Sequence, residues 1–301
     1  MKRTTLPLVF LSALTLPSNG AAISGTSFAY DLSASASVTG TLSMVPIAAV
    51  DITAVPVNQA SGISPAPYES DPTLISAGGE VSGIAAVSLA SDVDSLLASS
   101  DVDGLAGNRS VAADGVLIST SSNLALNLGL LGTVNLVTVN TTGAEALVSN
   151  STVQWDGSLL TPAAGSNFLS SGTSLTVLVL GLPIDVGILA PNVETVIPIN
   201  VQTALDLFTI LNATGEIRIT PDGFTVSGAS PLSASGSATA LRVSADLAVT
   251  SLNLVDLDVQ NEVIINQTSA TASAVPEPGP TLLALLAGLS VVGLRRRQVS
   301  K

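Results

Sequence analysis

The sequence predicts an all-β domain of long antiparallel strands, most simply two sheets packed as a sandwich. Apolar and polar residues alternate with period two over long stretches, which indicates strands with one buried face. The apolar share of 47% contains only 3% aromatic residues, and the β-branched side chains among the rest suit a pleated sheet. Proline, glycine and asparagine separate the alternating runs. A β-solenoid is the alternative, although no fixed repeat of about 20–30 residues is visible.

The clearest alternation begins at Phe28, from which the even positions up to Met44 are almost all apolar. Such a run in one register would extend about 55 Å. That length is unusual for a single strand, so we expect a bend near Gly40.

A second alternating region lies near the other end of the body. Its odd positions from Leu241 to Ile265 are mostly apolar, which leaves Asp256 and Asp258 on the exposed face. Further strand-like runs lie at 116–130, 133–139, 175–182, 193–201, 216–220 and 224–226.

Three segments between these runs carry other signals. Pro221-Asp222-Gly223 separates two short runs and predicts a hairpin turn. Ser91–Ser99 is the best helix candidate, because Ser91 is a suitable N-cap and two aspartates follow in the first turn. Residues 58–79 are rich in proline, serine and glycine and are expected to form a surface loop.

Charge and composition exclude several functions. Residues 23–274 hold three arginines against 21 acidic residues, a formal charge of −18, so the surface should repel nucleic acid. The chain lacks histidine and cysteine, the commonest general base and the zinc-binding thiolate. We therefore expect no cofactor and no enzymatic activity. A carboxylate-dependent glycoside hydrolase is a remote alternative, because such sites usually also need aromatic platforms for the sugar.

The N-terminal residues 1–22 have the three parts of a secretory signal peptide. Lys2 and Arg3 form the charged start, an apolar stretch follows over Leu6–Leu16, and cleavage is expected after Ala22. A short buried segment at the start of the fold is the alternative.

The C-terminal residues 275–301 predict a sorting and anchoring tail outside the β-rich body of residues 23–274. The prolines around Pro276-Glu277-Pro278 cannot lie in a helix or a central strand. The uncharged run Thr281–Leu294 would span about 21 Å as a helix, short for a transmembrane segment. The basic residues that follow are expected to stop it on the cytoplasmic side; they are Arg295, Arg296 and Arg297. A buried core helix is the alternative.

The order Pro-Glu-Pro, short apolar helix and basic end resembles the PEP-CTERM sorting signal of Gram-negative bacteria. The resemblance implies processing by an exosortase-type transpeptidase near Pro276, Glu277 and Pro278. It also implies a transient inner-membrane anchor, a producer of exopolysaccharide, and delivery to the outer surface or matrix. Exopolysaccharide is accordingly a further expected partner.

The body loosely resembles surface proteins of the choice-of-anchor P type. The resemblance rests on the alternation Tyr-Asp-Leu-Ser-Ala-Ser-Ala-Ser from Tyr30, on Thr-Ser-Leu-Thr-Val-Leu at 173–178 and on Glu-Ile-Arg-Ile at 216–219. It brings no activity and no catalytic residues.

A few polar residues of the body are weak candidates for ligand binding. Two Asp-Val-Asp triplets, nine residues apart, supply oxygen ligands of the kind that calcium prefers; their acids are Asp92, Asp94, Asp101 and Asp103. The full EF-hand loop is lacking, and a capped helix followed by a turn is the favoured interpretation. Trp155-Asp156-Gly157 is either a ligand-facing loop or a turn with one packed tryptophan. Asn-X-Ser/Thr triplets begin at Asn108, Asn140, Asn150, Asn212 and Asn266.

Together these patterns predict an exported surface or matrix protein with a structural or adhesive role. A carbohydrate- or calcium-binding module of the extracellular matrix is the alternative.

Overall fold

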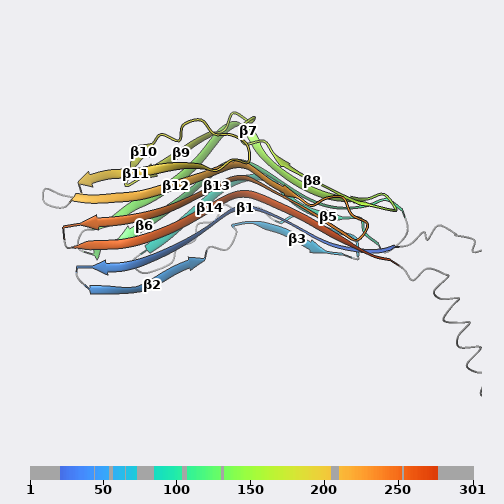
Figure 1. The fold of residues 1–301 in the computed structure, drawn as a ribbon, viewed down its shortest axis with the longest axis horizontal. Helices are drawn as coiled ribbons and strands as arrows, with labels where there is room; N and C mark the ends of the chain where they lie inside the picture. Colours follow the sequence, from blue (N-terminus) through green and yellow to red (C-terminus); the bar gives the residue numbers. More distant parts are fainter. Residues whose placement is uncertain are drawn as a thin grey trace, which may run out of the picture.

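The computed structural model is all-β (Figure 1). It describes residues 21–276 except for 44, 54–56, 65, 73–84, 104–106, 130–131, 205–209 and 253. Within these ranges the strands form two seven-stranded sheets, here sheet I and sheet II, and their strand pairs are antiparallel. The prediction of two antiparallel sheets is therefore confirmed, whereas a β-solenoid would stack parallel strands.

Sheet I has the order β11-β12-β13-β14-β1-β2, and β3 pairs with β1 on the same side as β2. Its strands are β11 (Thr195–Ala204), β12 (Ile210–Val226), β13 (Ser233–Ser251), β14 (Val255–Pro276), β1 (Ala21–Leu42), β2 (Val45–Thr53) and β3 (Gln59–Ile63). The first and last strands of the domain are thus central neighbours, which pair from Ala21–Pro276 to Leu42–Val255.

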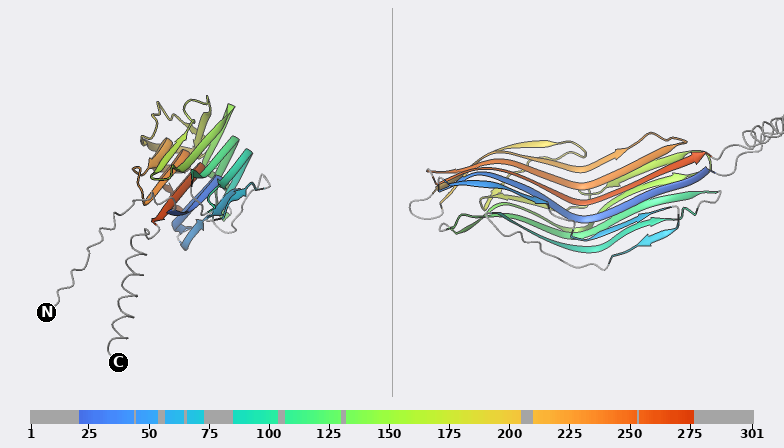
Figure 2. Two further views of the ribbon diagram at one scale, coloured as in Figure 1. Left: turned by 90° about the vertical axis from the view of Figure 1, so that its right-hand side faces the viewer. Right: turned by 90° about the horizontal axis from the view of Figure 1, so that it is seen from below.

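Sheet II has the order β10-β9-β7-β6-β5-β4, and β8 pairs with β7. Its strands are β10 (Leu182–Ile184), β9 (Ser174–Val179), β7 (Thr133–Trp155), β6 (Arg109–Asn127), β5 (Ala85–Ser100), β4 (Tyr68–Ser70) and β8 (Leu160–Ser166). Figure 2 shows this sheet lying against sheet I as a second layer.

The core between the sheets differs between the two halves of the molecule. One half is filled by a large cluster of leucine, valine and isoleucine from both sheets, with Leu32, Leu117 and Leu241 fully buried. The other half, where Ala21 of β1 pairs with Pro276 of β14, holds smaller clusters rich in alanine. A methyl group on Gly25 of sheet I would lie 2.7 Å from Cγ2 of Val111 in sheet II. Small side chains therefore allow the sheets to approach closely in this half.

A bend crosses sheet I midway along its long strands (Figures 1 and 2). At this line the alternation fails, because two successive residues are buried in each of four adjacent strands. These pairs are Asp31–Leu32, Ile265–Asn266, Ala240–Leu241 and Pro221–Asp222, aligned by the strand register. In sheet II the register shifts near Val93 in β5 and near Ile118 in β6. The irregularities of neighbouring strands thus coincide along one line.

Buried polar side chains cross-link the sheets at the bend. The Asp31 carboxylate accepts hydrogen bonds from the Asn58 backbone at 2.9 Å, from the Asn58 side chain at 2.8 Å and from the Ser91 hydroxyl of sheet II. Nδ2 of Asn266 donates to the carbonyls of Gly115 and Leu147 in sheet II, both at 2.9 Å.

Asp222 makes the third of these cross-links. Its carboxylate accepts from the Ser166 hydroxyl at 2.8 Å and from the backbone amides of Phe168 and Leu169 at 2.6 and 3.0 Å. The carboxylates of Asp31 and Asp222 can be buried because hydrogen bonds satisfy them, whereas Oδ1 of Asn266 is buried without a hydrogen-bond partner among the described residues.

Two sequence predictions about local structure are wrong. Ser91–Ser99 is part of strand β5, where pairing with β6 overrides the local helix signal. Pro221-Asp222-Gly223 is a distortion within the continuous strand β12, because β13 pairs with it on both sides of Asp222, whose φ is 46°.

Two further predictions are partly wrong. Residues 58–79 contain the short strands β3 and β4. Phe28 and Tyr30 lie on the outer face of sheet I, since the alternation slips at Asp31 and only the even positions from Leu32 to Val38 are buried. The bend of β1 lies at Asp31 and not near Gly40, where it was expected; near Gly40 the β1–β2 register shifts, and Gly40 has a φ of 130°.

Candidate functional site

Both ends of the described chain leave the body at the same place. Ala21 pairs with Pro276, and Ala22 pairs with Val275, at one end of sheet I. The strands β1 and β14 thus continue two residues beyond each predicted boundary of the body. Other predicted tail residues lie outside the described residues, namely Glu277, Pro278, Arg295, Arg296 and Arg297. No helix in the described ranges is long and apolar enough to cross a membrane.

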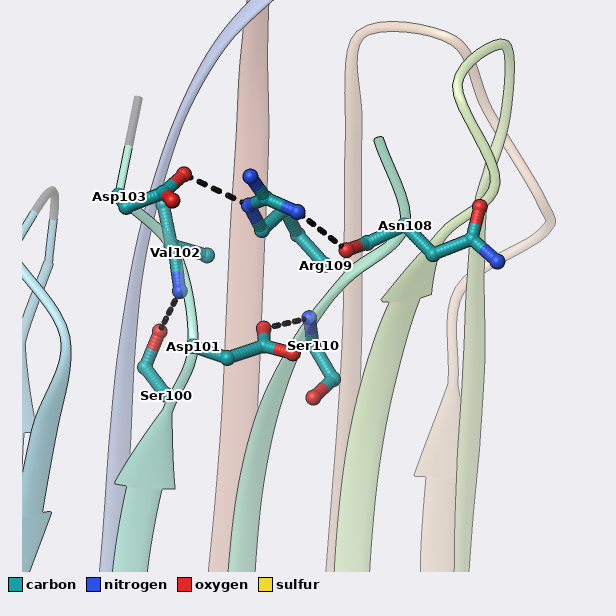
Figure 3. Close-up of polar contacts among 7 residues, drawn as sticks. All are labelled: Ser100, Asp101, Val102, Asp103, Asn108, Arg109 and Ser110. Carbon is teal, nitrogen blue, oxygen red and sulfur yellow. Dashed lines mark hydrogen bonds and ion pairs between the residues drawn. The ribbon is translucent and has the colours of Figure 1, made fainter. Parts of the chain in front are cut away.

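The calcium candidates occupy two separate parts of β5 and its end. Asp92 and Asp94 lie at the register shift in the middle of the strand and are exposed. Asp101 and Asp103 follow the last residue of the strand (Figure 3). Nine residues of strand extend about 30 Å, so the two triplets are not brought together. The described residues contain no group of three or more acidic side chains placed to hold a metal ion.

Asp101 and Asp103 instead connect β5 to the start of β6 (Figure 3). The Asp101 carboxylate accepts a hydrogen bond from the Ser110 amide. The Asp103 carboxylate accepts from Nε of Arg109 at 2.7 Å, and Nη1 of Arg109 donates to the Asn108 carbonyl at 2.7 Å. These contacts close the connection between two neighbouring strands, which is a structural use of both acids.

Trp155 is the last residue of β7 and packs into the smaller alanine-rich core at 7% exposure. The Asp156 carboxylate accepts hydrogen bonds from the backbone amides of Ser158 and Leu159, both at 2.8 Å, and these bonds lower its pKa. The turn with one packed tryptophan is therefore confirmed. A hollow of 460 Å³ beside it is bordered by Arg109, among others.

The candidate glycosylation sites differ in accessibility. Asn108 and Asn150 are exposed, whereas Asn266 is fully buried and its amide is used in the cross-link at the bend. Asn266 is thus not available to a glycosylating enzyme in the folded protein.

A polar groove of 720 Å³ lies on the outer face of sheet I. Its lining side chains form two rows across adjacent strands, because outward-facing residues share a register. The first row runs Glu216, Asp246, Gln260, Ser37 and Asp51, on β12, β13, β14, β1 and β2. The second row runs Arg218, Ser244, Glu262 and Ser35. Aspartates and glutamates predominate among the charged groups of the groove.

Part of this groove is held by ion pairs and hydrogen bonds. Nε of Arg218 donates to Glu216 at 2.8 Å, and this contact raises the arginine pKa. Nε of Arg242 lies 3.5 Å from the Glu262 carboxylate. The Ser37 hydroxyl donates to Asp51 at 2.7 Å. The side chains of Asp246, Gln260 and Ser244 make no hydrogen bond to any described residue. The centre of the groove is therefore open to an external donor or acceptor.

An aromatic pair lies on the same face of sheet I, further along β1 than the groove. The rings of Phe28 and Tyr30 are parallel within 4° and have centroids 6.1 Å apart. The Tyr30 hydroxyl donates to Gln267. Burial raises the Tyr30 pKa. In the β1 register Tyr30 pairs with Gln267, five residues from the groove pair Ser35–Glu262. Sequence reasoning missed this pair, because it assigned Phe28 and Tyr30 to the buried face.

Asp114 on β6 allows a pH test of the outer face of sheet II. Burial raises its pKa, so the folded state binds a proton more tightly than the unfolded state. The stability that Asp114 contributes is therefore fully present below its ordinary, unfolded-state pKa and is lost as the pH rises through its raised folded-state pKa. We expect Asp114→Asn to increase stability at pH 7 by at most about 0.5 kcal/mol, and not at pH 3. Urea unfolding at both pH values measures this; a larger gain at pH 3 contradicts it.

The chain matches no protein-family model, and a search of curated proteins finds no significant match.

Proposed function

We propose that this chain is an exported surface or matrix protein of a Gram-negative bacterium, sorted through its C-terminal tail, with a structural or adhesive role. The observation that carries the proposal is the order of Pro276-Glu277-Pro278, the uncharged run Thr281–Leu294 and three arginines. In this proposal the run crosses the inner membrane transiently, with its arginines on the cytoplasmic side. An exosortase-type enzyme then processes the tail.

The described body supports this role in two ways. The two ends of the domain pair with each other at Ala21 and Pro276, so a membrane-held tail places one end of the body next to the bilayer. The rest of the body then extends away from the membrane. The groove on the outer face of sheet I includes no aromatic side chain, and in the hollow that Trp155 borders the carboxylates of Asp101 and Asp156 accept hydrogen bonds from nearby backbone amides. A structural role accords with both.

Intact mass of the protein recovered from each cell fraction tests the sorting proposal. The wild-type protein is expected at the surface or in the medium, starting at Ile23 and lacking the arginine end. With Pro276, Glu277 and Pro278 all changed to alanine, we expect a heavier protein in the inner membrane that keeps its tail. Pro280→Ala is the matched control, because it changes the same proline-rich segment outside the motif. Wild-type protein in the cytosol with both ends intact would refute the proposal.

A further inference from the structure

Residues 85–91 of β5, here the β5 edge, form an open edge of sheet II. β6 pairs with them on one side, whereas β4 pairs only with residues 98–100 at the far end of β5. No described strand lies on the other side of the β5 edge, and no described loop backbone makes a hydrogen bond to it. Alternate residues of an antiparallel strand direct their N–H and C=O groups to opposite sides. The β5 edge therefore presents a row of backbone donors and acceptors to which another strand could pair.

The six described strands that have a single pairing partner carry features that oppose the addition of another strand. Proline lacks the N–H group that a new strand would need, and charged or covered edges disfavour a close neighbour. On five of these strands the residues concerned are Pro198 on β11, Pro46 on β2, Pro183 on β10, Pro162 on β8 and Glu69 on β4. The sixth, β3, is covered by β4, whose Ser70 hydroxyl accepts a hydrogen bond from the Ser61 amide at 3.4 Å. The β5 edge contains neither proline nor a charged residue.

The β5 edge is complementary to a second copy of itself. Its inward residues are buried, and its outward residues are small and uncharged, namely Ala86, Ser88 and Ala90. Two copies paired antiparallel about Ser88 place Ala86 opposite Ala90 and keep all residues of the edge paired. The first charged residue of β5 after the edge is Asp92, and the Asp92 residues of the two copies would lie about 27 Å apart. The acidic bodies can thus approach each other here without bringing like charges of β5 together.

Antiparallel pairing also determines how the two molecules are oriented. The β5 edge belongs to the half of the body that contains the large core cluster, of which Val87 and Leu89 are members. Both ends of the described chain lie in the other half, where Ala21 pairs with Pro276. When β5 pairs antiparallel with its copy, the molecules overlap through their large-cluster halves and their chain ends point in opposite directions. Copies held by their tails on two facing surfaces satisfy this geometry, whereas copies side by side in one membrane do not.

We propose that the β5 edge is a homophilic pairing site, at which a second copy of this chain adds its own β5 and extends sheet II across both molecules. A two-fold axis perpendicular to the sheet relates the copies. The partner for the adhesive role is thus the same protein on a facing surface. The facing orientation rests on the tail anchoring proposed above, whereas strand pairing is a property of the folded body alone.

Cysteine cross-linking of the folded protein recovered from cells tests the pairing, because the chain has no cysteine of its own. Directly opposite residues of an antiparallel pair have Cβ atoms about 4.5–5.5 Å apart, close to the separation in a disulfide. We therefore expect Ser88→Cys to form covalent dimers under mild oxidation. Ala86→Cys alone and Ala90→Cys alone should stay monomeric, because like positions are about 13 Å apart along the strands. A mixture of these two variants should form covalent dimers.

Ser121→Cys is the matched control for cross-linking. Ser121 lies beside Ala90 in the register but on β6, one strand in from the edge, so this variant should give no covalent dimer. Sedimentation of proteins without cysteine measures the affinity. The double change Ala86→Lys and Ala90→Lys places like charges opposite each other and should weaken self-association at least tenfold. The circular dichroism of its monomer should match that of the wild type.

The proposal is overturned if the wild-type protein sediments as a monomer up to millimolar concentration, or if the lysine variant associates as tightly as the wild type. It is also overturned if Ser88→Cys cross-links no faster than Ser121→Cys, or if Ala86→Cys cross-links alone as fast as it does with Ala90→Cys. Any of these results, with correct tail processing in cells, refutes this pairing and leaves the sorting proposal intact. Strand pairing in solution with an unprocessed tail in cells refutes the sorting proposal alone.

Discussion

Replacing Asp31 with alanine is expected to destabilise the folded body by about 3–5 kcal/mol. The Asp31 side chain is fully buried, and its carboxylate accepts hydrogen bonds from two donors of Asn58 and one of Ser91. Alanine leaves these donors buried without an acceptor, and each such group costs about 1–3 kcal/mol. Urea unfolding at pH 7, followed by circular dichroism, measures the difference.

Two further variants make this expectation specific. Asp31→Asn preserves the volume but turns an amide donor toward existing donors, so it should still cost more than about 1.5 kcal/mol. Asp258→Asn changes an exposed aspartate on β14 and should stay within about 0.5 kcal/mol of wild type. If Asp31→Ala is no more harmful than Asp258→Asn, the buried polar cross-link does not hold the sheets together.

The sequence predicts the fold class well because alternation is a local property of one strand. From Leu241 to Ile265 the predicted inward positions are largely buried, and Asp256 and Asp258 are exposed as expected. Alternation fails where a strand bends. Because Asp31 and Leu32 are both buried, Phe28 and Tyr30 face the opposite side of the sheet from the even positions after them. No pattern in the neighbouring sequence predicts this change. The signal emerges only when Asp31 and Asn266 are seen to lie beside each other in the register.

Local signals also fail where long-range pairing is strong. Ser91–Ser99 carries a capping serine and helical spacing, but β6 offers it a continuous partner strand. Pro221-Asp222-Gly223 has turn chemistry, yet β13 continues past it and keeps β12 in the sheet. The groove was beyond sequence reasoning for a related reason. Its rows join residues from five strands, and periodicity assigns a residue to a face without naming its neighbours across the sheet.

Ending the chain after Ser251, before β14, is expected to abolish cooperative folding. β14 lies between β13 and β1 and pairs with both along its length. It also supplies five buried core side chains, Val255, Leu257, Val259, Val263 and Ile265. At about 1.5–3 kcal/mol for each, their loss is comparable with the whole stability of a typical domain, about 5–15 kcal/mol. Thermal unfolding and limited proteolysis should show no protected core.

The chain that ends at Pro276 is the matched control, because it retains β14 and lacks only residues 277–301 of the predicted tail. Its melting temperature should lie within about 2 °C of that of the full chain. A loss of folding in this control would mean that residues 277–301 belong to the folded body, against the proposed sorting role. If both expectations hold, the centre of sheet I forms only when its last strand, β14, pairs with β1 and β13. In the export route proposed above, the chain would then remain unfolded during transport and would fold next to the membrane that holds its tail.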